Sequence, residues 1–168
     1  MNRQDPHRAT RTKCRGRGTL FAVASTTWGL TPRQSIEAEC NARGRDAVVA
    51  GCIALLERRQ VDPDLIVALG GPAAMWAAGD GTRGGPEYWL RVWAARGLLW
   101  VWDDSAQPAI LAALTDEAWR VREMAAKVVA RNGVGDAMPL LADLACDPVA
   151  RVRSAASRAM IRLTVAEA

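Results

Sequence analysis

Histidine is the side chain that most often moves protons in enzymes, and this chain of 168 residues contains one, His7. It lies in a segment rich in Arg, Gly, Thr and Ser, a composition typical of a disordered arm. Serine and cysteine nucleophiles and many zinc sites need a positioned imidazole. The sequence therefore argues against the common hydrolase mechanisms, and we expect no enzyme, no cofactor and no metal.

The paired carboxylates and the glycine-rich segment also have structural explanations. Asp103 and Asp104 are adjacent at a predicted turn between helices, where carboxylates accept hydrogen bonds from free backbone N–H groups. The segment 79–85 lacks a Gly-Lys-Ser/Thr ending and follows no strand, so it does not match a phosphate-binding loop. Neither feature predicts catalysis.

The cysteines and the hydropathy pattern favour a cytoplasmic protein. No apolar run approaches the ~18 residues of a membrane span. The segment from Leu20 to Ala24 resembles the core of a secretion signal, but its apolar stretch of about five residues falls short of the ~7 required. No Cys-x-x-Cys pair occurs, so we expect reduced thiols rather than a zinc site or disulfides. The cysteines are Cys14, Cys40, Cys52 and Cys146.

Positive charge is concentrated at the N-terminus. The net charge is +4, but residues 1–33 alone carry +6, from seven Arg or Lys against Asp5, which leaves −2 for the rest of the chain. The high pI therefore describes a tail more than a domain. We expect a basic, disordered arm over residues 1–30 and one helical domain over 31–168.

Helix-start signals recur throughout that domain. Thr31-Pro32-Arg33-Gln34 combines an N-cap, a proline at the first helical position and a capping box, and Asp62-Pro63 repeats the cap and the proline. Apolar residues return at helical spacing, and no convincing period-2 strand is present. We expect helices that start at 32, 45 and 63, a helix after Pro72, the longest helix over 86–102, and further helices over 105–115, 119–131, 137–146 and 149–163.

From Pro108 onward the chain repeats a pattern of residues at a constant interval. This interval equals the separation in sequence between Pro108 and Pro139. Pro108, Asp116, Val121, Arg122 and Ala125 recur at this interval as Pro139, Asp147, Val152, Arg153 and Ala156. Leu90, Arg91 and Ala94 form a third, partial match one interval before Val121, Arg122 and Ala125. Self-similarity at such a period indicates stacked units, none of which buries its apolar face alone.

The repeated pattern resembles the HEAT repeat, in a short form similar to that of the phycobilisome-lyase-type repeat proteins. The resemblance implies an all-α fold, an α-α superhelix in the form of a short HEAT-like solenoid of about three to four helical pairs. It implies that Asp116, Arg122, Asp147 and Arg153 form a ladder along the stack. It also implies that the helix with the Val-Arg pair lines the concave side.

Opposite the buried stripe of Val121, Ala125, Val128 and Val129 lies a stripe rich in cations. Stacked side by side, three such helices present seven cations against Glu123, with two tryptophans at one end. Such a face could clamp an acidic peptide, or take phosphates while bases stack on the indoles, but it is also what any solvated helix face carries. The candidate partner-binding residues are Trp89, Arg96, Trp100, Arg120, Lys127, Arg131, Arg151, Arg158 and Arg162.

We therefore expect a non-enzymatic scaffold or adaptor that binds a protein partner, acidic in character, through a basic, Trp-containing concave face. The alternative is a nucleic-acid-binding or DNA-repair protein resembling the HEAT-like alkylpurine DNA glycosylases. In that alternative Trp100, Trp102 and Asp104 would lie beside Arg120 and Arg131.

Overall fold

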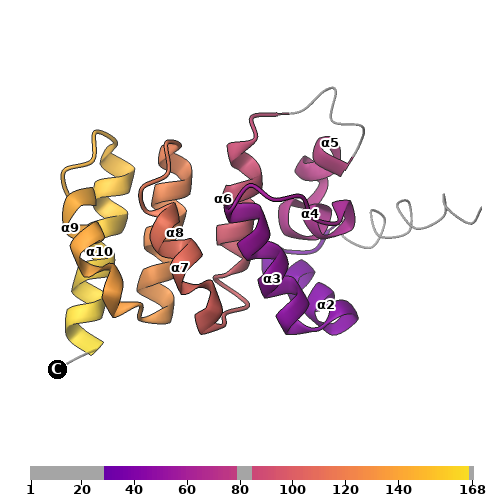
Figure 1. The fold of residues 1–168 in the computed structure, drawn as a ribbon, viewed down its shortest axis with the longest axis horizontal. Helices are drawn as coiled ribbons and strands as arrows, with labels where there is room; N and C mark the ends of the chain where they lie inside the picture. The colour runs from indigo at the N-terminus through magenta and orange to yellow at the C-terminus, as the bar shows by residue number, and fades with distance from the viewer. Residues whose placement is uncertain (1–28, 79–84, 167–168) are drawn as a thin grey trace, which may run out of the picture.

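The computed structural model describes residues 29–78 and 85–166, and Figure 1 shows their helices standing side by side along the long axis of the molecule. Every regular element in these ranges is a helix, which confirms the predicted all-α fold. The predicted arm, up to residue 28, and residues 79–84 of the glycine-rich segment lie outside the described residues. In chain order the helices are α2 (Pro32–Arg43), α3 (Arg45–Leu56), α4 (Pro63–Gly70), α5 (Met75–Ala78), α6 (Tyr88–Gly97), α7 (Gln107–Ala113), α8 (Trp119–Asn132), α9 (Met138–Leu144) and α10 (Ala150–Ala166), with short 3-10 turns η1 (Gly71–Ala74), η2 (Asp104–Ala106) and η3 (Gly135–Ala137).

The helix starts predicted from local signals are confirmed. At α2 the Gln34 backbone N–H donates to Thr31 Oγ1, and the Thr31 backbone N–H donates to Gln34 Oε1, which completes the capping box. At α4 the Asp64 backbone N–H donates to Asp62 Oδ1 at 2.9 Å. These interactions depend only on neighbouring residues, so the sequence carries the whole signal.

The prediction of a longest helix over 86–102 is wrong. The helix there, α6, spans 10 residues, whereas α10 spans 17. After Gly97 the backbone tightens into short turns, in which Leu99 donates to the Arg96 carbonyl and Trp100 to the Gly97 carbonyl. Leu98 and Val101 in these turns are buried. The apolar pattern therefore continues past the end of the helix.

The helices form pairs in two layers (Figure 1). The first layer contains α3, α7 and α9, and each packs against its partner in the second layer, α6, α8 and α10 respectively. Within the second layer α8 packs closely against both α6 and α10, whereas α7 and α9 make little contact with each other. The helices α2, α4 and α5 lie at the N-terminal end of the stack.

Small residues allow this close packing in the second layer. Val121, Ala125, Val152 and Ala156 have no exposed surface, as their repeated position predicts. Ala94, Ala125 and Ala156 occupy the same position in three consecutive repeats, and all three are fully buried. A methyl side chain lets two helix axes approach closely, so this repeated position determines the distance between neighbouring repeats.

The predicted ladder of carboxylates and arginines is present and extends one repeat further. Arg122 Nε donates to Asp147 Oδ2 at 2.7 Å, and Arg91 Nε donates to Asp116 Oδ2 at the same distance. Arg122 Nη1 also donates to the Asp116 carbonyl, and Arg153 Nη1 to the Asp147 carbonyl, both at 2.7 Å. Arg122 and Arg153 thus hold the turn that precedes their own helix, and Arg91 and Arg122 reach the carboxylate of the next repeat.

Candidate interaction surface

The structure places the predicted candidate residues on the second layer, along one side of three neighbouring helices. Trp89, Arg96 and Trp100 come from α6 and the turn after it, whereas the other six come from α8 and α10. The exposed members are Arg131, Arg151, Arg158 and Arg162. Trp89, Arg96, Trp100, Arg120 and Lys127 are half-buried. We call the candidate cations of α8 and α10 the cationic face, which leaves out the ladder residues Arg122 and Arg153: Arg120, Lys127, Arg131, Arg151, Arg158 and Arg162.

At one end of this face, Arg120 lies among aromatic rings. Its guanidinium carbon is 4.3 Å from the ring centre of Trp119, 5.4 Å from that of Trp89 and 5.9 Å from that of Tyr88. Arg151 in turn lies 5.6 Å from Trp119. A guanidinium over an aromatic face is attracted by the ring quadrupole, so the aromatic residues fix the position of these arginines.

Sequence reasoning missed Tyr88 and Trp119, although the repeat register contains the signal. Tyr88 and Trp119 occupy the same position in consecutive repeats, and Trp89, Arg120 and Arg151 occupy the next position in three repeats. Each arginine of this row therefore lies beside an aromatic residue of the repeat before it or of its own helix. Pairing the aromatic with the cationic positions of neighbouring repeats would have identified both residues.

The other end of the face repeats the arrangement with Trp100. The guanidinium carbon of Arg131 is 4.8 Å from the Trp100 ring centre, and that of Arg33, from α2, is 5.7 Å away. Trp100, Arg131 and Arg162 are again equivalent positions in three consecutive repeats. The Trp100 Nε1 atom is buried and has no hydrogen-bond partner among the described residues. Trp100 thus acts as a support for arginines and is not a freely exposed ring.

Arg96 corrects one prediction, because it does not extend freely from the face. Its Nη2 atom donates to the Leu69 carbonyl, near the C-terminal end of α4, at 2.5 Å. Burial lowers the pKa of its guanidinium, but an arginine is so basic that the group stays positively charged. Arg96 therefore ties α6 to α4, and we exclude it from the cationic face.

Glu123 is buried rather than exposed on the outer stripe. Its Oε1 atom accepts from Lys127 Nζ at 2.8 Å and from Arg151 Nη2 at 3.3 Å. Burial alone would raise the pKa of Glu123, but the hydrogen bonds and charges of Lys127 and Arg151 outweigh it, so this pKa lies below its ordinary value. The close packing of α10 on α8 explains its burial, which one helix considered alone could not predict.

Two shallow hollows follow the line between α8 and α10. One, of about 460 Å³, is lined by Leu99, Lys127, Ala130, Arg131, Ala155, Arg158 and Arg162. The second, of about 420 Å³, is lined by Glu123, Lys127, Ala150, Arg151, Ser154 and Arg158. They share Lys127 and Arg158, so they adjoin each other, and we call the two hollows together the α8–α10 groove.

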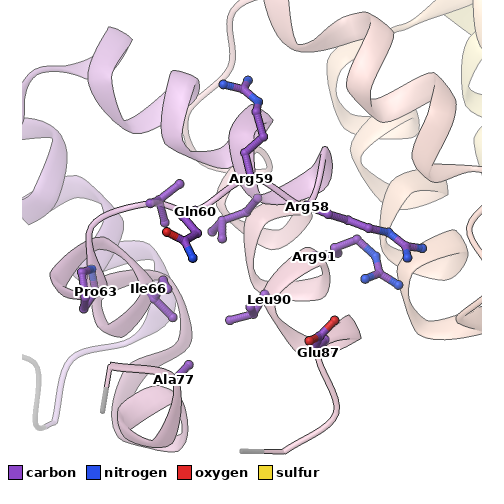
Figure 2. Close-up of a pocket in the computed structure, with 11 residues that line it drawn as sticks. Arg58, Arg59, Gln60, Pro63, Ile66, Ala77, Glu87, Leu90 and Arg91 are labelled. Carbon is purple, nitrogen blue, oxygen red and sulfur yellow. The ribbon is translucent and has the colours of Figure 1, made fainter. Parts of the chain in front are cut away.

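A larger hollow of about 570 Å³ lies away from this groove, between α3, α4, α5 and α6 (Figure 2). Its wall includes Leu55, Ile66 and Leu90, and Arg58 and Arg91 lie at its rim. Both arginines are already paired with carboxylates, Arg58 with Glu117 and Arg91 with Asp116 and Glu117. This hollow therefore has an apolar wall, and its two rim arginines are already bound to carboxylates of the protein.

The structure brings together only some of the residues of the DNA-glycosylase alternative. Trp102 Nε1 donates to Asp104 Oδ1 at 3.0 Å, and Arg131 lies on Trp100. Arg120, however, is eleven residues before Arg131 on α8, about 16 Å along a helix, and packs at the other end of the face. Asp103, the neighbouring carboxylate, accepts from the Ser105 backbone N–H and caps η2, as predicted.

The cysteines and other metal-binding side chains form no centre within the described residues. Cys40, Cys52 and Cys146 are free thiols, whereas Cys14 lies outside the described residues. Burial raises the pKa of the Cys52 thiol to about 12, so it stays protonated at neutral pH. Over residues 29–78 and 85–166, no group of three potential metal ligands occurs and no helix is long and apolar enough to cross a membrane.

Comparison with known proteins identifies a family but no individual relative. No curated protein and no solved structure gives a significant match. A family model described as HEAT repeats matches residues 78–161, which is half of the chain. This range contains α6, α8 and most of α10, the three equivalent helices, and the ladder that joins them. The chain belongs to the HEAT-repeat family.

Proposed function

We propose that this protein is a non-enzymatic HEAT-repeat scaffold of the cytoplasm, which binds a partner protein through the cationic face of its second layer. HEAT repeats commonly serve as interaction scaffolds, because a stack of repeats offers an extended surface. The helices that pack closest together belong to the inner side of a curved stack, and α6, α8 and α10 are those helices. This supports a concave position for the cationic face.

The observation that carries the proposal is that three arginines which line one hollow of the cationic face have no carboxylate partner among the described residues. Arg131, Arg158 and Arg162 form no ion pair within residues 29–78 and 85–166, although other arginines of these ranges do. Arg131 and Arg158 line the same groove, together with Lys127. Like charges held close together repel one another, and an acidic partner would relieve this repulsion.

The described residues also support a binding role over a catalytic one. The most prominent Asp and Arg side chains, Asp116, Asp147 and Arg122, are engaged in the ladder, and Asp103 in a helix cap. The single histidine, His7, lies outside the described residues. The carboxylates that drew attention in the sequence thus have structural partners.

The test is affinity capture followed by direct binding measurements with the purified partner. We expect Arg158→Glu combined with Arg162→Glu to abolish binding, since both side chains are exposed on the cationic face. The matched control is Arg45→Glu combined with Arg59→Glu, which makes the same change of net charge at exposed positions on or just after α3. Equal loss with both pairs, or loss with neither, would contradict the proposal.

The nucleic-acid alternative is tested with the same proteins. Its phosphate contacts would make the affinity fall steeply with salt, with a slope near −0.9 for each duplex phosphate neutralised. We expect neither duplex nor single-stranded DNA to bind at ~50 mM salt. Binding with that salt slope, lost in the Arg158→Glu and Arg162→Glu variant, would replace our proposal with this alternative.

A further inference from the structure

The α8–α10 groove has the length of a short extended peptide. Its two hollows run from Arg151 to Arg162 on α10, eleven residues, or about 16 Å along the helix axis. An extended chain rises about 3.3 Å per residue, so about five residues fill this length. In Figure 1 the two helices stand next to each other at the C-terminal end of the stack.

The lining of the groove is strongly unbalanced in charge. It contains the five cations of the cationic face other than Arg120, and one carboxylate, Glu123, which Lys127 and Arg151 already share. Arg131, Arg158 and Arg162 have no carboxylate partner among the described residues. The charge of the groove is therefore complementary to an anion.

The contacts of Trp100 favour a carboxylate ligand over a nucleic acid, whose bases would need the face of this ring. Arg131 lies over the Trp100 ring at 4.8 Å, and Arg33 approaches the same ring at 5.7 Å. A guanidinium held over an aromatic ring still has N–H groups available for a carboxylate, and its planar fork suits two-pronged hydrogen bonds. A base could stack on Trp100 only by displacing these arginines.

The wall of the groove supplies a second element of recognition. Between the cations it exposes Leu99 and Ala130, both half-buried, beside the buried Ala155. Small apolar side chains leave room for an apolar side chain of a ligand. Such an apolar wall makes no favourable contact with a chain of phosphates. It suits a peptide in which acidic residues flank an apolar one.

We infer that the α8–α10 groove binds an acidic peptide segment of the partner, about five residues long and extended, in which carboxylates flank an apolar side chain. This inference rests on the proposed function and specifies the chemistry of its partner. Arg131 of α8, which lies over Trp100, and Arg158 of α10 bind the carboxylates. Leu99 and Ala130 contact the apolar side chain.

The experiment uses the full chain and a fluorescein-labelled peptide, Glu-Glu-Leu-Glu-Glu, blocked at its C-terminus. Fluorescence anisotropy at ~100 mM salt should show saturable binding, and the same peptide with glutamine in place of glutamate should not bind. Arg131→Gln and Arg158→Gln should each weaken binding about tenfold, since each removes a charge-assisted contact. Arg45→Gln, an exposed change on α3, should leave the affinity unchanged.

The outcomes separate this inference from the proposed function. If the acidic peptide does not bind, or if Arg131→Gln and Arg158→Gln leave its affinity unchanged, the groove inference is wrong. The proposed function would still stand if the purified partner bound and was lost in the Arg158→Glu and Arg162→Glu variant. Tighter binding of a decathymidine oligonucleotide than of the acidic peptide, lost in Arg158→Gln, would assign the groove to nucleic acid and overturn the inference.

Discussion

The guanidinium of Arg91 binds both carboxylate oxygens of Asp116, with Nε at 2.7 Å from Oδ2 and Nη2 at 3.1 Å from Oδ1. Both side chains are buried, at 5% and 8% exposure, and they join α6 to the turn before α8. In the next repeat Arg122 Nε alone donates to Asp147, at 2.7 Å from Oδ2, and this hydrogen bond joins α8 to the turn before α10. The ladder therefore connects each of these repeats to the next one in the stack.

Removing one member of the ladder should destabilise the fold. Asp147 also accepts from the Val149 backbone N–H at 2.8 Å, so Asp147→Ala removes a turn contact and leaves Arg122 without its carboxylate. We expect a loss of about 3 kcal/mol in the free energy of unfolding, measured by urea denaturation. The control Asp143→Ala, at an exposed position of α9, should cost less than about 0.5 kcal/mol. Similar losses in the two variants would mean that the ladder carries no special share of the stability.

Acid should weaken the fold through the same carboxylate. Burial alone would raise the pKa of Asp147, but hydrogen bonds from Arg122 and Val149 and the charges of Arg122 and Arg153 outweigh it, so this pKa is lowered on folding. A lowered folded-state pKa gives stability that is complete above the unfolded pKa of about 3.9 and is lost as pH falls through the folded pKa. We expect the melting temperature to fall steeply below about pH 4. Asp147→Asn should start lower and depend less on pH, whereas an unchanged slope would exclude Asp147 as the source.

The buried face of α10 can be tested with two neighbouring residues. Ala156 has no exposed surface and lies between helices, whereas Ser157 is exposed. Ala156→Glu should lower the free energy of unfolding by several kcal/mol, since an unpaired charge enters the core. Ser157→Glu should cost about 0.5 kcal/mol or less in the same denaturation series. The reverse order would show that the helix faces had been assigned wrongly.

Arg58 holds an unfavourable backbone conformation that glycine would relieve. Its φ is 59°, the only positive value at a non-glycine residue among the described ones, and it follows the C-terminus of α3. There the Arg59 backbone N–H donates to the Ala54 carbonyl, an arrangement in which glycine is preferred. Arg58→Gly should raise the free energy of unfolding by about 0.5 kcal/mol, since relief of strain exceeds the loss of the exposed ion pair with Glu117. Arg58→Val should be destabilising, and if calorimetry ranks valine above glycine this interpretation is wrong.

The sequence predicted those parts of the fold that local signals or the repeat register determine. The capping box of Thr31 and Gln34 involves neighbours in the chain, and the ladder residues recur at fixed spacing. The end of α6 at Gly97 was not predictable in this way, because the following turns are buried and keep an apolar pattern.

The candidate surface was predicted in composition but not in detail. Arg96 belongs to the cation stripe by its helical position, yet it binds the Leu69 carbonyl of α4, a helix earlier in the chain. Glu123 is buried because α10 covers it, and Trp100 is covered by arginines from α2 and α8. Contacts between helices that are distant in sequence determine the burial and the partners of these three residues. The spacing of residues within one helix does not predict such contacts.

The most direct test of the proposed interaction surface is site-specific photo-crosslinking to the purified partner. A benzoylphenylalanine in place of Ser154, an exposed residue of the α8–α10 groove, should form an adduct with the partner. The same group in place of Ala142, exposed on α9 in the first layer, should form none. Adducts from position 142 without any from position 154 would contradict the account and place the interaction surface on the opposite layer.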